Sequence, residues 1–120
     1  MIQGEWKDAI VPQFVADPPE AGTLSPEVDL GRAYQRIMVV IPTIDEASVN
    51  IQVAEKTGGT FQDLYITSLT DGDDDKIITT ASVGGTTWVA PLGGFQFIKI
   101  QTSAAQTTAA VTFRVCGVRD

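Results

Sequence analysis

Alternation of apolar and polar side chains is the clearest pattern in this chain. In segment 48–54 the apolar residues alternate with Ser, Asn, Gln and Ala, and in segment 111–116 they alternate with Thr, Arg and Cys. A period of two residues places the apolar members on one face of a β-strand. The pattern predicts two half-buried antiparallel strands whose core residues are Val49, Ile51, Val53, Val111, Phe113 and Val115.

Other short runs rich in β-branched and aromatic residues are separated by Gly, Pro, Asp and Asn, an arrangement typical of sandwiches and barrels. The predicted strands lie near 27–31, 34–41, 47–55, 61–67, 76–83, 86–90, 95–101 and 109–118. Phe97, Ile98 and Ile100 are further expected core residues. One helical turn is expected at 43–48, and no longer apolar period of 3.6 residues occurs. We therefore predict an all-β fold, an antiparallel β-sandwich that is jelly-roll-like or Ig-like.

The first 27 residues differ in character from the rest. Four prolines in this segment prevent a continuous helix and remove donors from any β-ladder; they are Pro12, Pro18, Pro19 and Pro26. We expect an extended N-terminal arm over residues 1–27 and a sandwich domain over residues 28–120. The apolar side chains of the arm need cover, and we expect another subunit to supply it at Trp6, Ile10, Val11, Phe14 and Val15.

Composition supports one ordered domain. The 120 residues are 43% hydrophobic and 19% charged, which is enough for a single core. The net charge is −7, with 15 acidic and 8 scattered basic residues, so direct contact with nucleic acid or an anionic membrane is not expected. The start of the chain lacks the pattern of a signal peptide, and a soluble protein is expected. The only cysteine, Cys116, lies in an apolar run and is expected to be buried and unreactive.

An acidic segment at 71–75 is the densest local feature. Asp71, Asp73 and Asp75 alternate like the first ligands of a calcium loop. The match then fails, because Lys76 stands where that loop needs Gly and Ser82 stands where it needs Glu. A solvated hairpin tip is the favoured interpretation, with calcium as the lesser alternative.

Catalytic signatures are not assembled in the sequence. There is no histidine to serve as a base, no phosphate-binding loop, and too few Cys or His ligands for zinc. A pair of facing carboxylates, as in glycosidases, stays open as a minor alternative. We therefore expect no cofactor and no enzymatic activity. Exposed aromatic rings at Tyr65 or Trp88 could bind sugars, although core packing is the favoured interpretation for both.

Several segments together resemble small β-sandwich proteins encoded beside the structural genes of tailed bacteriophages. The likeness begins with an aliphatic-Pro step, which is followed by an alternating strand and by a Gly-Gly-Thr-Phe-x-Asp-Leu-Tyr segment. After these come an acidic turn, a strand with an aromatic-Ile-Lys-Ile core, and a closing strand with a basic residue. These segments are Val39–Pro42, Val49–Val53, Gly58–Tyr65, Asp71-Gly72, Phe95–Ile100 and Gln106–Val115 with Arg114. They cover about three-quarters of the chain from residue 28, and the arm is not part of the likeness.

The resemblance implies a virion protein assembled in the host cytoplasm, in particular a capsid decoration (cement) protein or another head-associated component. Its implied partner is the major capsid protein, and a homo-oligomer is expected, with a trimer favoured because capsid lattices offer three-fold sites. Two alternatives remain at this point: a carbohydrate-binding module, and a tail or adhesin-type module.

Overall fold

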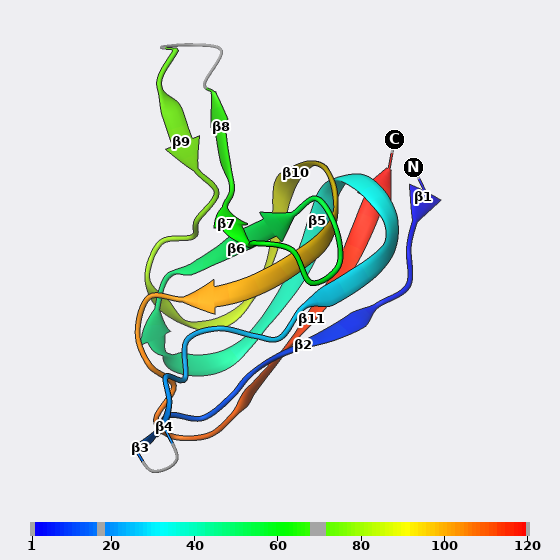
Figure 1. Cartoon of the computed structure of the whole chain (residues 1–120). Coiled ribbons are helices and arrows are strands. Elements are labelled where there is room, and N and C mark those ends of the chain that lie inside the picture. The colour runs from blue at the N-terminus through cyan, green and yellow to red at the C-terminus, as the bar shows by residue number, and fades with distance from the viewer. Residues whose placement is uncertain (1, 17–18, 68–71, 120) are drawn as a thin grey trace.

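The computed structural model describes residues 2–16, 19–67 and 72–119, and every regular element in these residues is a β-strand (Figure 1). The strands are β1 (Ile2–Gln3), β2 (Lys7–Val11), β3 (Val15–Ala16), β4 (Pro19–Glu20), β5 (Val28–Ala47), β6 (Val49–Ala54), β7 (Gln62–Asp63), β8 (Tyr65–Thr67), β9 (Asp74–Lys76), β10 (Ser82–Thr102) and β11 (Val111–Arg119). All strand pairs are antiparallel. The predicted all-β antiparallel fold is confirmed. The helical turn expected at 43–48 is wrong, because β5 continues to Ala47.

Two long strands, β5 and β10, build both layers of the fold. The main sheet has the order β1-β11-β5-β10-β6-β7, with β2 also paired to β11. The first part of β10 pairs with the second half of β5 at Trp88 and Val39, whereas its last part pairs with β6 at Ile100 and Ile51. The sheet therefore bends back on itself and encloses a core between its two halves (Figure 1).

The bends occur at glycines. Gly93 and Gly94 lie between the strands predicted at 86–90 and 95–101, and Gly31 is the last residue of the strand predicted at 27–31. Gly31 in β5 has a φ of 91°, and Gly93 and Gly94 in β10 have φ of 69° and 93°. The pairing of β5 with β10 shifts register between Pro91 and Phe95. Glycine adopts these left-handed conformations without steric cost, so each strand turns a corner where separate strands were expected.

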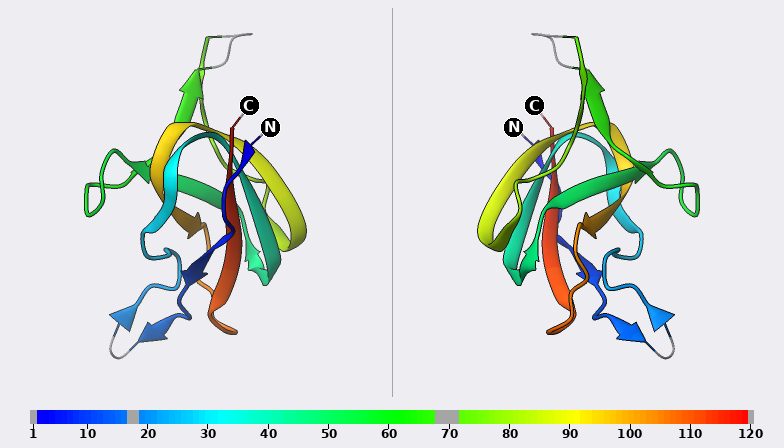
Figure 2. Two further views of the ribbon diagram at one scale, coloured as in Figure 1. Left: turned by 90° about the vertical axis from the view of Figure 1, so that its right-hand side faces the viewer. Right: turned by 90° about the vertical axis from the view of Figure 1, so that its left-hand side faces the viewer.

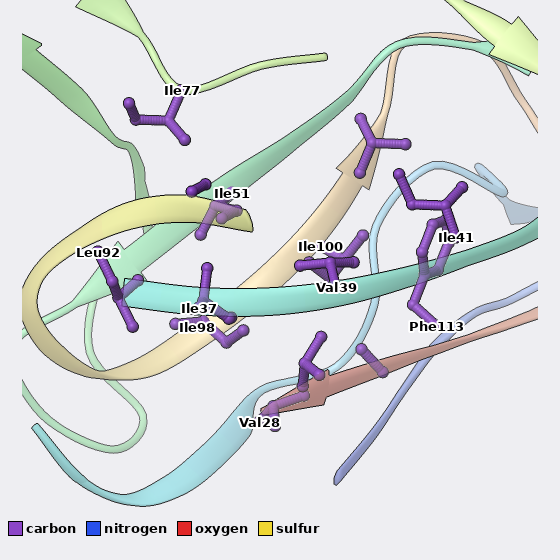
Figure 3. Packing of buried hydrophobic residues seen from close by; sticks show 14 of the residues in the cluster. Val28, Ile37, Val39, Ile41, Ile51, Ile77, Leu92, Ile98, Ile100 and Phe113 are labelled. Carbon is purple, nitrogen blue, oxygen red and sulfur yellow. The ribbon is translucent and has the colours of Figure 1, made fainter. Parts of the chain in front are cut away.

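The core is mostly aliphatic, with Phe113 at one end of the group drawn in Figure 3 and with Tyr34 also in the cluster. The alternation that predicted the inward faces of β6 and β11 is confirmed: Val49, Ile51, Val53, Val111, Phe113 and Val115 are all buried. Ile98 and Ile100 are also buried as predicted, with exposed fractions of 0%. Phe97 is only half-buried, which corrects the prediction, because consecutive residues of a strand point to opposite faces.

The N-terminal segment lies on its own domain. β1 and β2 pair with β11, and Ala9 and Val11 are buried at 1% and 0% exposure. Further along, Ser25 donates its backbone N–H to Ile100, and Gly22 accepts from the N–H of Gln106, both at 2.9 Å. The prediction that another subunit covers Val11 is therefore wrong, because its own chain already covers this side chain. The sequence analysis missed this because it took the four prolines of the segment as a sign that no strand forms there, whereas all four follow β2 and none interrupts it.

Candidate interaction surfaces

The β8–β9 hairpin projects from the edge of the sheet beside β6 (Figure 1). Just before it, the N–H of Leu64 donates to the carbonyl oxygen of Ile51 at 3.1 Å, and just after it the N–H of Thr79 donates to Val49 at 2.8 Å. The chain therefore follows β6, leaves it for residues 65–76, and returns to the same strand. None of the described residues in this excursion is buried, so the hairpin adds nothing to the core.

A polar cluster fixes the root of the hairpin. The carboxylate of Asp63 accepts hydrogen bonds from Asn50 Nδ2 at 3.1 Å and from Gln52 Nε2 at 3.3 Å. Its other oxygen lies 3.3 Å from Nζ of Lys76, the last residue of β9. Asn50 is only 2% exposed, so this arrangement also satisfies a buried amide. These contacts set the direction in which the hairpin leaves the body.

Beyond its root, the hairpin presents an aromatic and an aliphatic side chain to solvent. Tyr65 is 53% exposed and Ile66 is 38% exposed, with Asp74 and Asp75 exposed on the facing strand. Trp88, the other aromatic candidate for sugar binding, is only partly buried and packs against the core. Tyr65 is therefore the more accessible ring of the two.

Two of the acidic residues proposed for calcium belong to this hairpin, Asp75 in β9 and Asp73 just before it. Asp73 and Asp75 are exposed, whereas Asp71 falls outside the described residues. Within residues 2–16, 19–67 and 72–119 no three Asp, Glu, Cys or His side chains gather in a way that could hold a metal ion. The same residues include no helix long and apolar enough to cross a membrane. Calcium binding by these aspartates stays a prediction from the sequence.

The N-terminal interface candidates separate into three environments. Ile10, Phe14 and Val15 are exposed at 44%, 47% and 41%, Trp6 is half-buried, and Val11 is fully buried. Val15 belongs to the small β3–β4 hairpin, which lies at the end of the molecule opposite to β8–β9 (Figure 2). The molecule thus carries a projecting hairpin with exposed apolar residues at each end.

An apolar patch on the open face of the sheet was not among the sequence predictions. Val40 is 37% exposed and Val89 is 57% exposed, and Met38, which pairs with Val89, lies on the same face. Beside Val40 lies Arg114, which pairs with Asp8 at 2.7 Å. The sequence signal that could have revealed this patch is the presence of valine in β5 and β10 at positions that alternate with the core residues.

The loop between β10 and β11 is fastened to the end of β5 by Asp45. Its carboxylate accepts hydrogen bonds from the hydroxyl of Thr108 at 2.7 Å and from the backbone N–H groups of Thr107 and Thr108 at 2.7 and 3.1 Å. These bonds, led by that of the Thr108 hydroxyl, lower the pKa of Asp45 to about 2. The buried amide of Gln106 adds bonds to the backbone of Asp45. The role of this acidic residue is therefore structural.

The thiol of Cys116 is buried, as the sequence predicted, and donates a 3.2 Å hydrogen bond to the carbonyl oxygen of Gly4. Burial raises its pKa, so the thiolate is less populated at neutral pH than for an exposed cysteine. The contact also fastens the N-terminal strand to β11.

Comparisons with known proteins extend this picture. No protein-family model matches the chain, and no curated protein matches it. Among solved structures, the chain is similar to the crystal structure of the SPBc2 prophage-derived protein YomS, with a TM-score of 0.55 and 13% sequence identity. The match covers 98% of this chain and 95% of that chain. The chain therefore shares the fold of a prophage-derived protein along nearly its whole length.

Proposed function

We propose that this chain is a structural protein of a bacteriophage particle, most specifically a capsid decoration (cement) protein. The observation that carries the proposal is the match of fold with a prophage-derived protein over 98% of this chain. Identity of 13% shows the fold alone, so the step to a phage function also uses the sequence segments that resemble phage β-sandwich proteins.

The physical form of the chain supports a binding role. A cement protein needs a rigid body that resists deformation and exposed elements that reach neighbouring subunits. Here the aliphatic core supplies the rigid body, and the β3–β4 and β8–β9 hairpins extend from its two ends (Figure 2). We propose the major capsid protein as the partner, no enzymatic activity and no cofactor. The net charge of −7 disfavours direct contact with packaged nucleic acid.

Location in the particle tests this proposal. Particles released from cells that carry the gene are separated on a density gradient into filled heads, tails and free protein, and an antibody against this chain locates it. We expect the chain in the filled-head fraction, retained after a high-salt wash. Recovery with tails alone would favour the tail or adhesin-type alternative, and recovery only at the top of the gradient would contradict a structural role.

Carbohydrate binding is the second candidate, and the exposure of Tyr65 favours it. The ring of Tyr65 is 53% exposed and lies near acidic side chains. Such a ring can stack on the face of a sugar while the carboxylates accept hydrogen bonds from the sugar hydroxyl groups. A glycan array with the intact chain and the Tyr65→Ala variant tests this. Signals that the variant loses would support the candidate, and a blank array with the intact chain would remove it.

A further inference from the structure

We propose that the open edge of β10 pairs with the same edge of a second copy of this chain, so that the two copies form one continuous antiparallel sheet. Each copy contributes the segment from Thr86 to Ala90, and the two-fold axis passes through Trp88. The inference concerns self-association, so it can be tested without a phage particle.

The first part of β10 has a strand on one side only. Thr86 to Pro91 pair in unbroken register with β5, whereas β6 pairs with β10 only from Phe97 to Thr102. Among the residues that the structure describes, no other strand pairs with 86–91. This part of β10 lies at the outer margin of the molecule in both views of Figure 2. Alternate residues of an antiparallel strand turn their backbone N–H and C=O groups away from the neighbouring strand, so the open edge offers hydrogen bonds to a further strand.

The open edge has a defined length. At one end Gly84 and Gly85 have φ of 82° and 78°, and the register with β5 shifts between Ser82 and Gly84. At the other end Pro91 has no N–H to donate, and the register shifts again after it. The regular segment between these interruptions is 86–90, and Trp88 is its central residue. Antiparallel pairing about a two-fold axis at Trp88 therefore uses the whole of this segment in both copies.

Trp88 is incompletely covered within its own chain. It packs against the core and pairs with Val39, which is 0% exposed, yet Trp88 itself stays partly exposed. Val39 has a strand on each side because it also pairs with Val115 of β11, whereas Trp88 has only β5 beside it. In the proposed contact the two Trp88 residues form a cross-strand pair, an arrangement in which aromatic side chains stabilise antiparallel sheets. Each ring then covers the exposed part of the other.

Charge favours a second copy as the occupant of this edge. Each copy has a net charge of −7, so two copies repel unless they meet along an uncharged surface. No charged residue occurs from Ile77 to Ile98 or from Ile37 to Ile44, so β5 and β10 are neutral beside the proposed contact. An edge without charge is complementary to an identical edge and places no like charges opposite each other. The strands β2 and β7, in contrast, carry Asp8 and Asp63.

The symmetry of the contact predicts a dimer. Pairing about a two-fold axis uses the open edge of both copies, so the assembly closes at two copies and does not extend into a filament. On the open face of the sheet, Val89 lies opposite Thr87 of the second copy, which covers part of a side chain that is 57% exposed in one copy. The dimer differs from the trimer that the sequence resemblance favours.

Charges placed on the edge test the pairing. In the variant Thr87→Lys/Val89→Lys each new lysine lies opposite a lysine of the second copy, and Thr87→Glu/Val89→Glu repeats the test with carboxylates. Both positions are exposed, so the domain should fold, which circular dichroism verifies. The matched control is Thr112→Lys/Ile66→Lys, which adds the same charge as the lysine variant at exposed positions outside β10. Sedimentation equilibrium of the full chain measures dimerisation.

We expect the intact chain and the control to be dimers at micromolar concentrations. Each charged variant should dimerise about tenfold or more weakly, and an equimolar mixture of the lysine and glutamate variants should recover dimers. Trp6→Phe leaves Trp88 as the single tryptophan, and its emission should shift to longer wavelength when dilution separates the copies.

An intact chain that is monomeric, charged variants that dimerise like the control, or Trp88 emission that is unchanged by dissociation would each overturn the pairing. A monomeric chain whose lysine variant is lost from filled heads would assign the edge to another protein. A monomer that sediments with filled heads would leave the proposed function standing, and a dimer absent from particles would do the opposite.

Discussion

The backbone N–H of Ile77 donates a 2.9 Å hydrogen bond to the carbonyl oxygen of Leu64, and both side chains are 7% exposed. This pair closes the β8–β9 excursion at its base, so the core ends where the hairpin begins. The hairpin is therefore an insertion on the edge of the sheet and contributes little to folding.

Shortening the hairpin should leave the domain folded. Tyr65 and Lys76 are paired across β8 and β9, so replacing residues 66–75 by Asn-Gly provides a two-residue turn of the type that joins paired strands. We expect a thermal midpoint within a few degrees of the intact chain by circular dichroism. In contrast, Ile77→Ala should destabilise the protein by about 2–5 kcal/mol, because it empties a buried site. Unfolding of the shortened chain would show that the hairpin supports the core.

Phe113→Ala should be among the most damaging single substitutions. Phe113 is 0% exposed and is the largest of the fully buried side chains. Its truncation should cost about 3–5 kcal/mol, measured as a lower midpoint of chemical unfolding. The matched control is Thr112→Ala on the exposed face of the same strand, for which we expect a change within about 0.5 kcal/mol. Equal effects of the two variants would contradict the orientation of β11.

Gly84 and Gly85 allow backbone strain to be separated from a steric clash. Both have positive φ, 82° and 78°, so alanine at either position should cost about 1–2 kcal/mol. A Cβ on Gly84 would also overlap the carbonyl oxygen of Pro42, whereas a Cβ on Gly85 meets no atom within 4 Å. Gly84→Ala should therefore lower the unfolding free energy clearly more than Gly85→Ala. Similar losses would mean that the chain relaxes away from Pro42.

Strand faces were predictable from sequence where alternation was regular, as at Val111, Phe113 and Val115, because these residues face the core while Thr112 and Arg114 face solvent. In β6 the same alternation predicted the core face, although Asn50 on the other face is also buried. Strand continuity was not predictable. The Gly93-Gly94 pair was predicted as a turn and Gly31 as the end of a strand, and only pairing with a distant strand shows that they are bends within β10 and β5. The exposed valines of the open face were missed for a similar reason, since valine has the same β propensity on either face.

Acid should weaken the fold in part through Asp45. Its pKa in the folded protein is about 2, below the ordinary value of 3.8, so the folded state favours the charged carboxylate. The stability that this group adds is present above its unfolded pKa and is lost as pH falls from about 4 toward 2. The Asp45→Asn variant should be less stable than the intact chain at pH 7, and the difference should shrink by pH 2. A difference that is independent of pH would contradict this role.

Deletion of residues 1–11 should destabilise the sandwich. β2 pairs with β11 from Lys7 to Val11, and Ala9 and Val11 fill the core at 1% and 0% exposure. Val11→Ala removes part of a fully buried side chain and should itself cost about 1–3 kcal/mol. Ile10 belongs to the same strand but is 44% exposed, so Ile10→Ser is the matched control and should leave the unfolding midpoint nearly unchanged. Circular dichroism and sedimentation of the three variants separate the two roles of this segment. A truncated chain that keeps its stability but no longer assembles would show that residues 1–11 act as a tether to other subunits. Unfolding of the truncated chain would show that β2 is part of the domain, so that only exposed residues such as Ile10 and Phe14 are available to a partner.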